Sequence, residues 1–229
     1  TGHAAMEVGG TIGTLNNAGT ISSGWNAWAL YVYTTTGGAG TVTTLNNTGA
    51  ISSVREGIIV EGGGAQIGTI NNSGTITGGS GTSGNSYSGI AVRSGAAIGT
   101  ITNTGTISAN GGLVALSMAS ALGTISGVIN ADGLIEAKSV QSANGRVILD
   151  AGPNGALAVK GTVTVEGAQT GEVGGLITAS GSLVTVEQQA MLNADGKAGG
   201  GQANADRHAH RVAAQGGDQF EPDRCNEPG

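Results

Sequence analysis

The stretch Ile67-Gly68-Thr69-Ile70-Asn71-Asn72-Ser73-Gly74-Thr75-Ile76-Thr77 decides the fold class of this 229-residue chain. Three further copies of the 11-residue pattern occur, at residues 12–22, 42–52 and 98–108. The second Asn of one copy is 30, 25 and 31 residues from that of the next. The copies keep their length while the linking segments vary, which is typical of stacked coils whose loops bulge outward. The sequence therefore predicts an all-β, right-handed parallel β-helix (β-solenoid) of about 25–31 residues per coil.

Stacking of the copies predicts ladders of identical side chains along the axis. We expect inward aliphatic ladders, with Ile12, Leu15 and Ile21 at the start of each row and Leu45 paired with Ile70. The second Asn of each copy should form a hydrogen-bonded amide ladder, although an Asn that merely tolerates the bend is the alternative. The invariant Gly of each copy indicates a bend with positive φ. These two rows contain Asn17, Asn47, Asn72 and Asn103, then Gly19, Gly49, Gly74 and Gly105.

Composition agrees with a repeat protein and excludes several other classes. Gly accounts for 45 residues, only 10% of residues are charged and 3% are aromatic. This argues against a helical protein, and the low charge argues against simple disorder. The net charge of −6 includes no basic patch, so a nucleic-acid partner is not expected. The single cysteine, Cys225, excludes a disulfide framework, and the opening Thr1-Gly2-His3 suggests a piece of a longer product.

The repeat weakens after the fourth copy, but short strands continue. A degenerate copy occurs at residues 129–136, and further strand-like runs include Arg146–Asp150 and Leu183–Glu187. We therefore assign residues 1–201 to one solenoid, with divergent coils at 122–201. Residues 202–229 carry a dense group of charges and no repeat, which predicts either a disordered tail or a frameshifted end outside the solenoid.

These residues resemble a known family. The Ile-Gly-Thr-Ile-Asn-Asn-Ser-Gly-Thr-Ile-Thr pattern looks like the passenger repeats of bacterial autotransporters. The stretch from Gly145-Arg146-Val147-Ile148-Leu149-Asp150 to Gly199-Gly200-Gly201 resembles the stalk of filamentous haemagglutinin-like exoproteins. The resemblance implies type V secretion through an outer-membrane translocator, a long β-helix at the bacterial cell surface, and adhesion to a host or environmental receptor or glycan.

Few residues suggest chemistry. Gly79–Gly84 matches a dinucleotide fingerprint, but no βαβ pattern surrounds it. His208 and His210 lack further metal ligands, and His3 is isolated. Glu56 and Glu61 could form a glycosidase-like acid and base pair, but we interpret them as solvated loop charges. We therefore predict no catalytic, cofactor-binding or metal-binding residues and no cofactor.

Binding features are similarly sparse. Trp25, Trp28, Tyr31 and Tyr33 form one aromatic cluster. It either packs under the adjacent loop, caps the open end of the solenoid, or contacts a carbohydrate or receptor. Asn46 and Asn71 match the glycosylation acceptor pattern, which coincides with the repeat.

The function expected from the sequence is a non-enzymatic, structural stalk segment of an exported adhesin. Two alternatives remain: a solenoid polysaccharide hydrolase or lyase, and an ice- or surface-binding solenoid. The second is suggested by the equivalent positions of Thr14, Thr44, Thr69 and Thr100.

Overall fold

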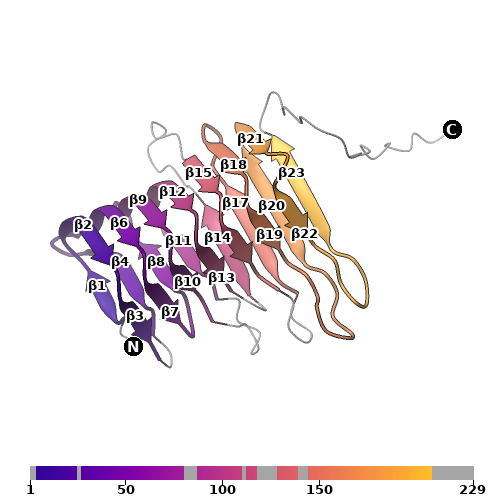
Figure 1. Cartoon of the computed structure of the whole chain (residues 1–229). Helices are drawn as coiled ribbons and strands as arrows, with labels where there is room; N and C mark the ends of the chain where they lie inside the picture. Colours follow the sequence, from indigo (N-terminus) through magenta and orange to yellow (C-terminus); the bar gives the residue numbers. More distant parts are fainter. Residues whose placement is uncertain are drawn as a thin grey trace.

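The computed structural model of the chain is a parallel β-solenoid of about six turns, whose coils follow one another in chain order along a single axis (Figure 1). The structure describes residues 4–24, 27–79, 87–109, 112–117, 128–138 and 144–207. Within these ranges there is no helix, and the hairpin of β4 (Leu30–Thr35) with β5 (Gly38–Ala39) is the one antiparallel pair of strands. The predicted all-β, parallel solenoid is therefore confirmed.

Each coil contributes one strand to each of three faces. The first face consists of two consecutive sheets: β1 (Met6–Val8), β4 (Leu30–Thr35), β8 (Ile58–Glu61) and β11 (Ile90–Arg93), then β14 (Leu113–Ser117), β17 (Arg146–Asp150), β20 (Leu176–Gly181) and β23 (Gln202–Arg207). The second face is one 7-stranded sheet: β2 (Thr11–Asn17), β6 (Thr41–Asn47), β9 (Gln66–Asn72), β12 (Ala97–Asn103), β15 (Val128–Ala131), β18 (Ala156–Val159) and β21 (Leu183–Val186). The third face is also 7-stranded: β3 (Thr20–Ser23), β7 (Ala50–Ser53), β10 (Thr75–Thr77), β13 (Thr106–Ser108), β16 (Leu134–Glu136), β19 (Thr162–Thr164) and β22 (Met191–Asn193).

The predicted aliphatic ladders form the core. Leu45 pairs with Ile70, which in turn pairs with Ile101, and all three side chains are fully buried. Ile76 is fully buried, whereas its neighbour Thr75 is exposed, so side chains alternate between core and solvent as expected. Seven stacked strands supply each row on the second and third faces. Each coil depends on its neighbours, because a single coil cannot cover its own apolar side chains.

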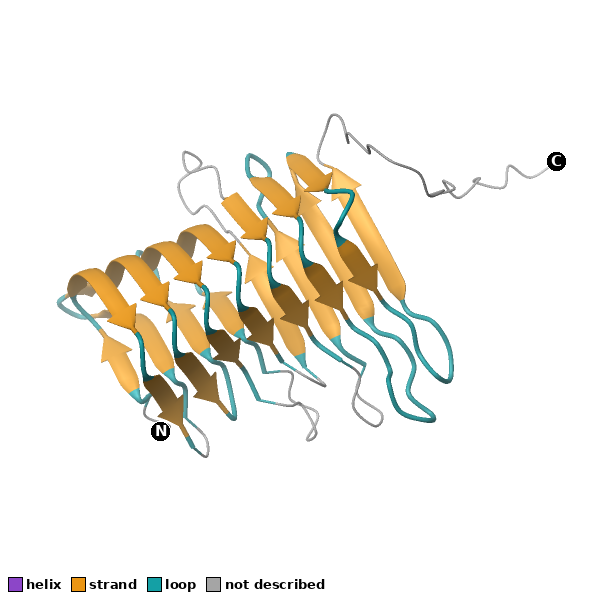
Figure 2. Cartoon of the chain, in the orientation of Figure 1, coloured by secondary structure: helices purple, strands orange, loops and turns teal. Residues whose placement is uncertain are grey.

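The variable coil length is absorbed outside the strands. Figure 2 shows long loops leaving along one side of the solenoid, between the third-face strand of one coil and the first-face strand of the next. The connection from β19 to β20 runs from Thr164 to Leu176, whereas β2 and β3 are separated only by Ala18 and Gly19. The two-residue corner between the second and third faces thus keeps its length from β2 to β19, and only the corner between β21 and β22 is longer.

Glycine is needed at this corner because the backbones of successive coils approach closely, and not because the corner has a positive φ. None of Gly49, Gly74 and Gly105 has a left-handed backbone, which contradicts the prediction from sequence. A Cβ atom on Gly105 would lie 2.1 Å from the carbonyl oxygen of Gly74, and one on Gly49 would lie 2.0 Å from that of Gly19. The same contact recurs at Gly133 and Gly161. Each glycine is required because the backbone of the preceding coil leaves no room for a side chain.

The solenoid also extends beyond the boundary predicted at residue 201. β23 pairs in parallel with β20 from Gln202 to Arg207. This strand lacks an apolar row, so the sequence pattern does not reveal it, but an edge strand can form through backbone hydrogen bonds with polar side chains. The rest of the predicted tail, residues 208–229, lies outside the described residues.

Candidate functional site

Charge is distributed unevenly over the first four coils. Between residues 4 and 109 the charged residues are Glu7, Arg55, Glu56, Glu61 and Arg93. Glu7, Glu61 and Arg93 belong to strands of the first face, and Arg55 and Glu56 precede β8 of the same face. The strands of the second and third faces over these coils carry no charge. The candidate site is therefore built on the first face.

Aromatic rings and a guanidinium form a continuous stack there. Tyr33 stacks on Tyr31 with ring centroids 4.6 Å apart, and Tyr31 packs on Trp28 at 4.8 Å. The guanidinium carbon of Arg55 then lies 5.0 Å from the centroid of Trp28 and 5.5 Å from that of Tyr87. Both distances suit cation–π attraction. We call these five side chains, together with Glu56, the aromatic stack.

The buried carboxylate of Glu56 holds the aromatic stack in place. It is 1% exposed and forms an ion pair with Arg93 through its Oε1. Its Oε2 accepts a hydrogen bond of 2.7 Å from the Trp28 indole nitrogen and lies 3.8 Å from Arg55 Nε. A carboxylate this deeply buried is tolerable because two arginines compensate its charge.

The aromatic stack covers the outer side of the first-face sheet. Ile59 pairs in register with Tyr31 on one side and Ala91 on the other, and it points away from the interior because Ile58 and Val60 belong to the core. It is nevertheless fully buried. Burial raises the pKa of the Tyr31 hydroxyl, and Glu61, which accepts its hydrogen bond at 3.3 Å, raises it further. The cluster thus acts as a second, external core.

This geometry favours packing over ligand binding for the described aromatic residues. Tyr31 contacts the rings of Trp28 and Tyr33, and Trp28 contacts Tyr31 and the Arg55 guanidinium, so each ring already has two packing partners within the protein. Trp25, the fourth member of the predicted cluster, lies outside the described residues. Tyr87 and Arg55 were not recognised as members of the cluster from the sequence.

The interpretation of Glu56 as a solvated loop charge is wrong, and Glu61 is only partly exposed. The two carboxylates serve different neighbours, since Glu56 is held by arginines and Trp28, while Glu61 accepts from Tyr31. A sequence signal for this arrangement does exist. Trp28 and Glu56 are 28 residues apart, about one coil, so stacking places them side by side.

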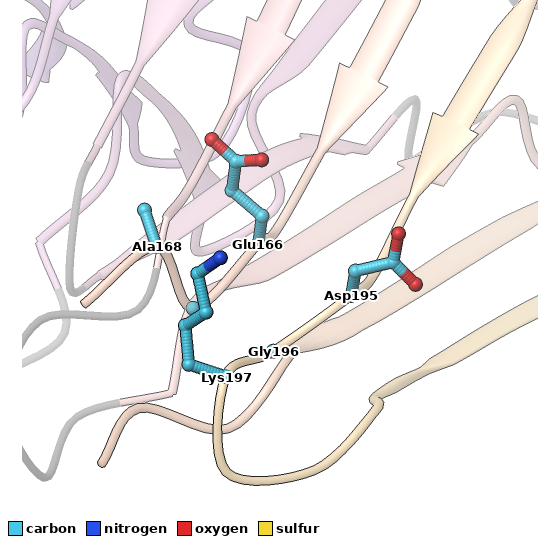
Figure 3. Close-up of a pocket in the computed structure, with 6 residues that line it drawn as sticks. Glu166, Ala168, Asp195, Gly196 and Lys197 are labelled. Atoms are coloured by element: carbon cyan, nitrogen blue, oxygen red, sulfur yellow. The ribbon is translucent and has the colours of Figure 1, made fainter. Parts of the chain in front are cut away.

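A second candidate is a shallow hollow of about 390 Å³ between the loops that follow β19 and β22 (Figure 3). It is lined by Glu166, Gly167, Ala168, Asp195, Gly196 and Lys197. The carboxylate of Glu166 is already engaged, with Oε1 3.6 Å from Lys138 Nζ and Oε2 accepting from Asn193 Nδ2 at 3.0 Å. The described lining of the hollow includes no Ser, Thr, Cys or His side chain.

The other residues singled out from the sequence add no candidate site within the described residues. Gly79 of the dinucleotide fingerprint packs so closely on Val54 that a Cβ on Gly79 would lie 1.8 Å from the Val54 carbonyl oxygen. Residues 80–84 of the fingerprint lie outside the described residues. The same holds for His3, His208, His210 and Cys225. Asn46 and Asn71 are second-face residues whose amides bond along the axis. In the described ranges no three His, Cys, Asp or Glu side chains are grouped as metal ligands, and no helix is long and apolar enough to cross a membrane.

Comparisons with known proteins found no match for this chain. No family model matches the sequence. Neither the curated proteins nor the solved structures include a significant match.

Proposed function

We propose that this chain is a structural stalk segment of an exported bacterial surface adhesin. In this role it holds a binding region away from the cell surface and performs no catalysis. Export through an outer-membrane translocator, and attachment to a host or environmental receptor or glycan, belong to the same proposal.

The observation that carries the proposal is the continuous register of the coils. Strands of the second face pair without interruption from β2 to β21, and those of the third from β3 to β22. A rod built this way transmits force through many parallel backbone hydrogen bonds and stacked side chains, and it needs no partner to keep its shape. The uncharged, hydroxyl- and amide-bearing strands of the second and third faces of the first four coils suit a solvated rod surface.

The hydrolase or lyase alternative has weaker support. Catalysis by a carboxylate pair requires one oxygen free to exchange a proton with substrate. Both Glu56 oxygens are held by neighbouring donors, which suits a structural role.

The surface-binding alternative is favoured by one observation. Thr14, Thr44, Thr69 and Thr100 pair in register on the second face, beside a column of bonded asparagines. Inhibition of ice recrystallisation by the purified chain, lost in Thr44→Lys and Thr69→Lys, would establish it. No effect on ice growth would remove it.

Immunolabelling tests the stalk proposal. Antibodies against the folded chain should label intact cells of the source organism, and electron microscopy should show the label along fibres at the cell surface. Labelling that appears only after the cells are permeabilised would contradict an exported stalk.

A further inference from the structure

The aromatic stack on the first face contains a run of three rings that can each lose an electron. The Trp28 indole packs on the Tyr31 phenol with ring centroids 4.8 Å apart, and Tyr31 stacks on Tyr33 at 4.6 Å. Both distances are those of rings in direct contact. Indole and phenol are the aromatic side chains that are oxidised most readily, and rings in contact exchange an electron much faster than rings separated by solvent. The three rings therefore form a path for an electron along the outside of the solenoid.

The middle ring of this run is bonded to a group that can take its proton. The Tyr31 hydroxyl donates a hydrogen bond to Glu61 Oε2 at 3.3 Å. Loss of an electron makes a phenol O–H strongly acidic, so the ring must release its proton as the electron leaves. A carboxylate within hydrogen-bond reach accepts that proton directly and lowers the barrier to the step. The site thus supplies an acceptor for the proton as well as a path for the electron.

The charges around Trp28 do not favour a positive ring at that position. The guanidinium carbon of Arg55 lies 5.0 Å from the centroid of the indole, and its positive charge disfavours loss of an electron from the ring. Trp28 Nε1 donates to Glu56 Oε2 at 2.7 Å. The negative charge of this carboxylate, however, is offset by Arg93 and Arg55. An oxidised indole is therefore poorly stabilised by its surroundings.

The charges around Tyr31 act in the opposite sense. Burial raises the pKa of its hydroxyl most, and the carboxylates of Glu61 and Glu7 raise it further, so the phenol keeps its proton in the resting protein. Once the ring has lost an electron, the same two negative charges stabilise it, and Glu61 can take the proton. Both effects favour the oxidised state on Tyr31 over Trp28.

The two ends of the aromatic stack differ. Within the described part of the chain Tyr33 is the last ring beyond Tyr31, at an interplanar angle of 16°, and it is partly exposed to solvent. On the other side of Trp28 the Arg55 guanidinium separates the indole from the Tyr87 ring, at 5.0 and 5.5 Å from the two centroids. A guanidinium does not donate an electron, so the path toward Tyr87 is interrupted. The path toward Tyr33, in contrast, leads through rings in direct contact.

We propose that Trp28, Tyr31 and Tyr33 form a one-electron relay, which carries oxidation by a small radical oxidant from Trp28 to the phenol of Tyr33. The relay is a property of the fold and does not depend on the proposed stalk function. Its consequence is that oxidative damage moves from an indole bonded to the buried Glu56 onto a partly exposed phenol.

Electrons and protons balance at each step of the relay. The radical oxidant takes one electron from Trp28 and leaves in its reduced form, while the indole proton stays in its hydrogen bond with Glu56. One electron then moves from Tyr31 to the oxidised Trp28, and the Tyr31 proton passes to Glu61. Finally one electron moves from Tyr33 to Tyr31, which recovers its proton from Glu61, and Tyr33 releases its own proton to water. The net change is the loss of one electron and one proton from Tyr33.

Pulse radiolysis tests the relay. Azide radicals are the oxidant, and Trp25 is replaced by Phe in every sample, so that Trp28 is the indole that is oxidised. We expect the absorption of the indolyl radical to decay while that of the tyrosyl radical grows, at a rate that is independent of protein concentration because the transfer is intramolecular. Tyr31→Phe keeps a packed ring that cannot be oxidised, and should slow the transfer at least about tenfold. Tyr87→Phe, the same change beyond Arg55, is the control and should leave the rate within about twofold.

A second pair of variants tests the proton acceptor. Glu61→Gln has nearly the same shape but cannot take a proton, and should slow growth of the tyrosyl radical at least about tenfold. Glu7→Gln removes the same charge near Tyr31 but keeps the acceptor of its hydrogen bond, so the rate should stay within about threefold. Spin trapping followed by peptide mapping should find the radical on Tyr33, and on Trp28 in Tyr31→Phe. Growth that depends on protein concentration, an unaltered rate in Tyr31→Phe, or equal effects of the two glutamate changes would each overturn the proposal.

Discussion

The first four coils and the last three share a backbone but not a side-chain ladder. In the first four, the corner residue of the second face is Asn17, Asn47, Asn72 or Asn103, whereas its paired equivalents in the later coils are Ala131, Val159 and Val186. The corner hydrogen bonds do not change. Gly49 N donates to Asn17 O at 3.0 Å, and Gly161 N donates to Ala131 O at 2.9 Å.

This difference shows which corner residue the bend requires and which it only accommodates. The glycine persists through both regions until Gly161, because the close approach of successive backbones is common to them. The asparagine is replaced by apolar residues, so it is not a requirement of the bend. Its ladder supplies bonds between coils that the later region obtains from apolar contacts and from ion pairs such as Lys160–Glu187.

The largest effect we expect comes from the aliphatic rows, which both regions share. Ile76→Asp would bury an uncompensated carboxylate and should cost several kcal/mol, enough to unfold the early coils. Thr75→Asp, one residue earlier on the solvated side, should cost less than about 1 kcal/mol. Chemical denaturation of both variants measures the difference, and equal losses would refute the inward and outward assignment.

The amide ladder should give the next largest effect. Asn72→Ala deprives Asn103 Oδ1 and the Thr106 carbonyl of their donor, and should destabilise the protein by about 2–4 kcal/mol. Asn71→Ala removes an exposed amide from the outer ladder and serves as the matched control, with a loss below about 1 kcal/mol. The reverse exchange, Val159→Asn, should also destabilise, because its paired neighbours Ala131 and Val186 have no amide to meet it. A neutral Asn72→Ala would show that the ladder is dispensable in its own region too.

Glycine at the corner allows a direct test of the shared backbone. Gly105→Ala and Gly161→Ala each place a Cβ 2.1 Å from a carbonyl oxygen, and both should lose about 1–3 kcal/mol. Gly19→Ala should be neutral or slightly stabilising, because the new methyl meets no atom and restricts the unfolded chain. Thermal melts of the three variants provide the comparison. A loss at Gly105 without one at Gly161 would mean that the two regions turn differently.

The Tyr31 hydroxyl, in the external core on the first face of the first four coils, can be followed by pH titration. The pKa of Tyr31 is raised above 10.0 by burial first and by Glu61 second, so the neutral hydroxyl is favoured in the folded state. Its contribution to stability is present below pH 10.0 and is lost as the pH rises through the folded-state pKa. Ultraviolet difference titration should show a tyrosine component at the alkaline end that disappears in Tyr31→Phe. Glu61→Gln should move this component to lower pH, and no movement would exclude Glu61 as a cause.

The smallest effect should come from the ion pair of the later coils. Lys160 Nζ lies 3.2 Å from Glu187 Oε1, and both side chains are 47% exposed. Lys160→Met should cost below about 1 kcal/mol, and the difference should vanish in about 1 M salt because exposed charges are screened. A larger or salt-independent loss would indicate that the later coils depend on their charges.

Much of the fold could be predicted because equivalent positions in the repeat copies identify which residues of neighbouring strands pair. Once Leu45 and Ile70 are recognised as equivalent positions, parallel pairing follows, and so do the amide and aliphatic ladders. The burial of Glu56 could not be read locally, since its partners Trp28 and Arg93 are 28 and 37 residues away. The role of the corner glycine was misjudged for a related reason, because its constraint comes from another coil and not from its own φ.

The variable loops along one side have a consequence for growth of the rod. The coil from Asn47 to Asn72 uses 25 residues, and the one from Asn72 to Asn103 uses 31. Both advance the axis by one interstrand step of roughly 4.8 Å. Height is therefore counted in coils and not in residues, so mass can be added to a loop without lengthening the molecule. A family of such rods could differ widely in molecular weight and still end at the same distance from where they start.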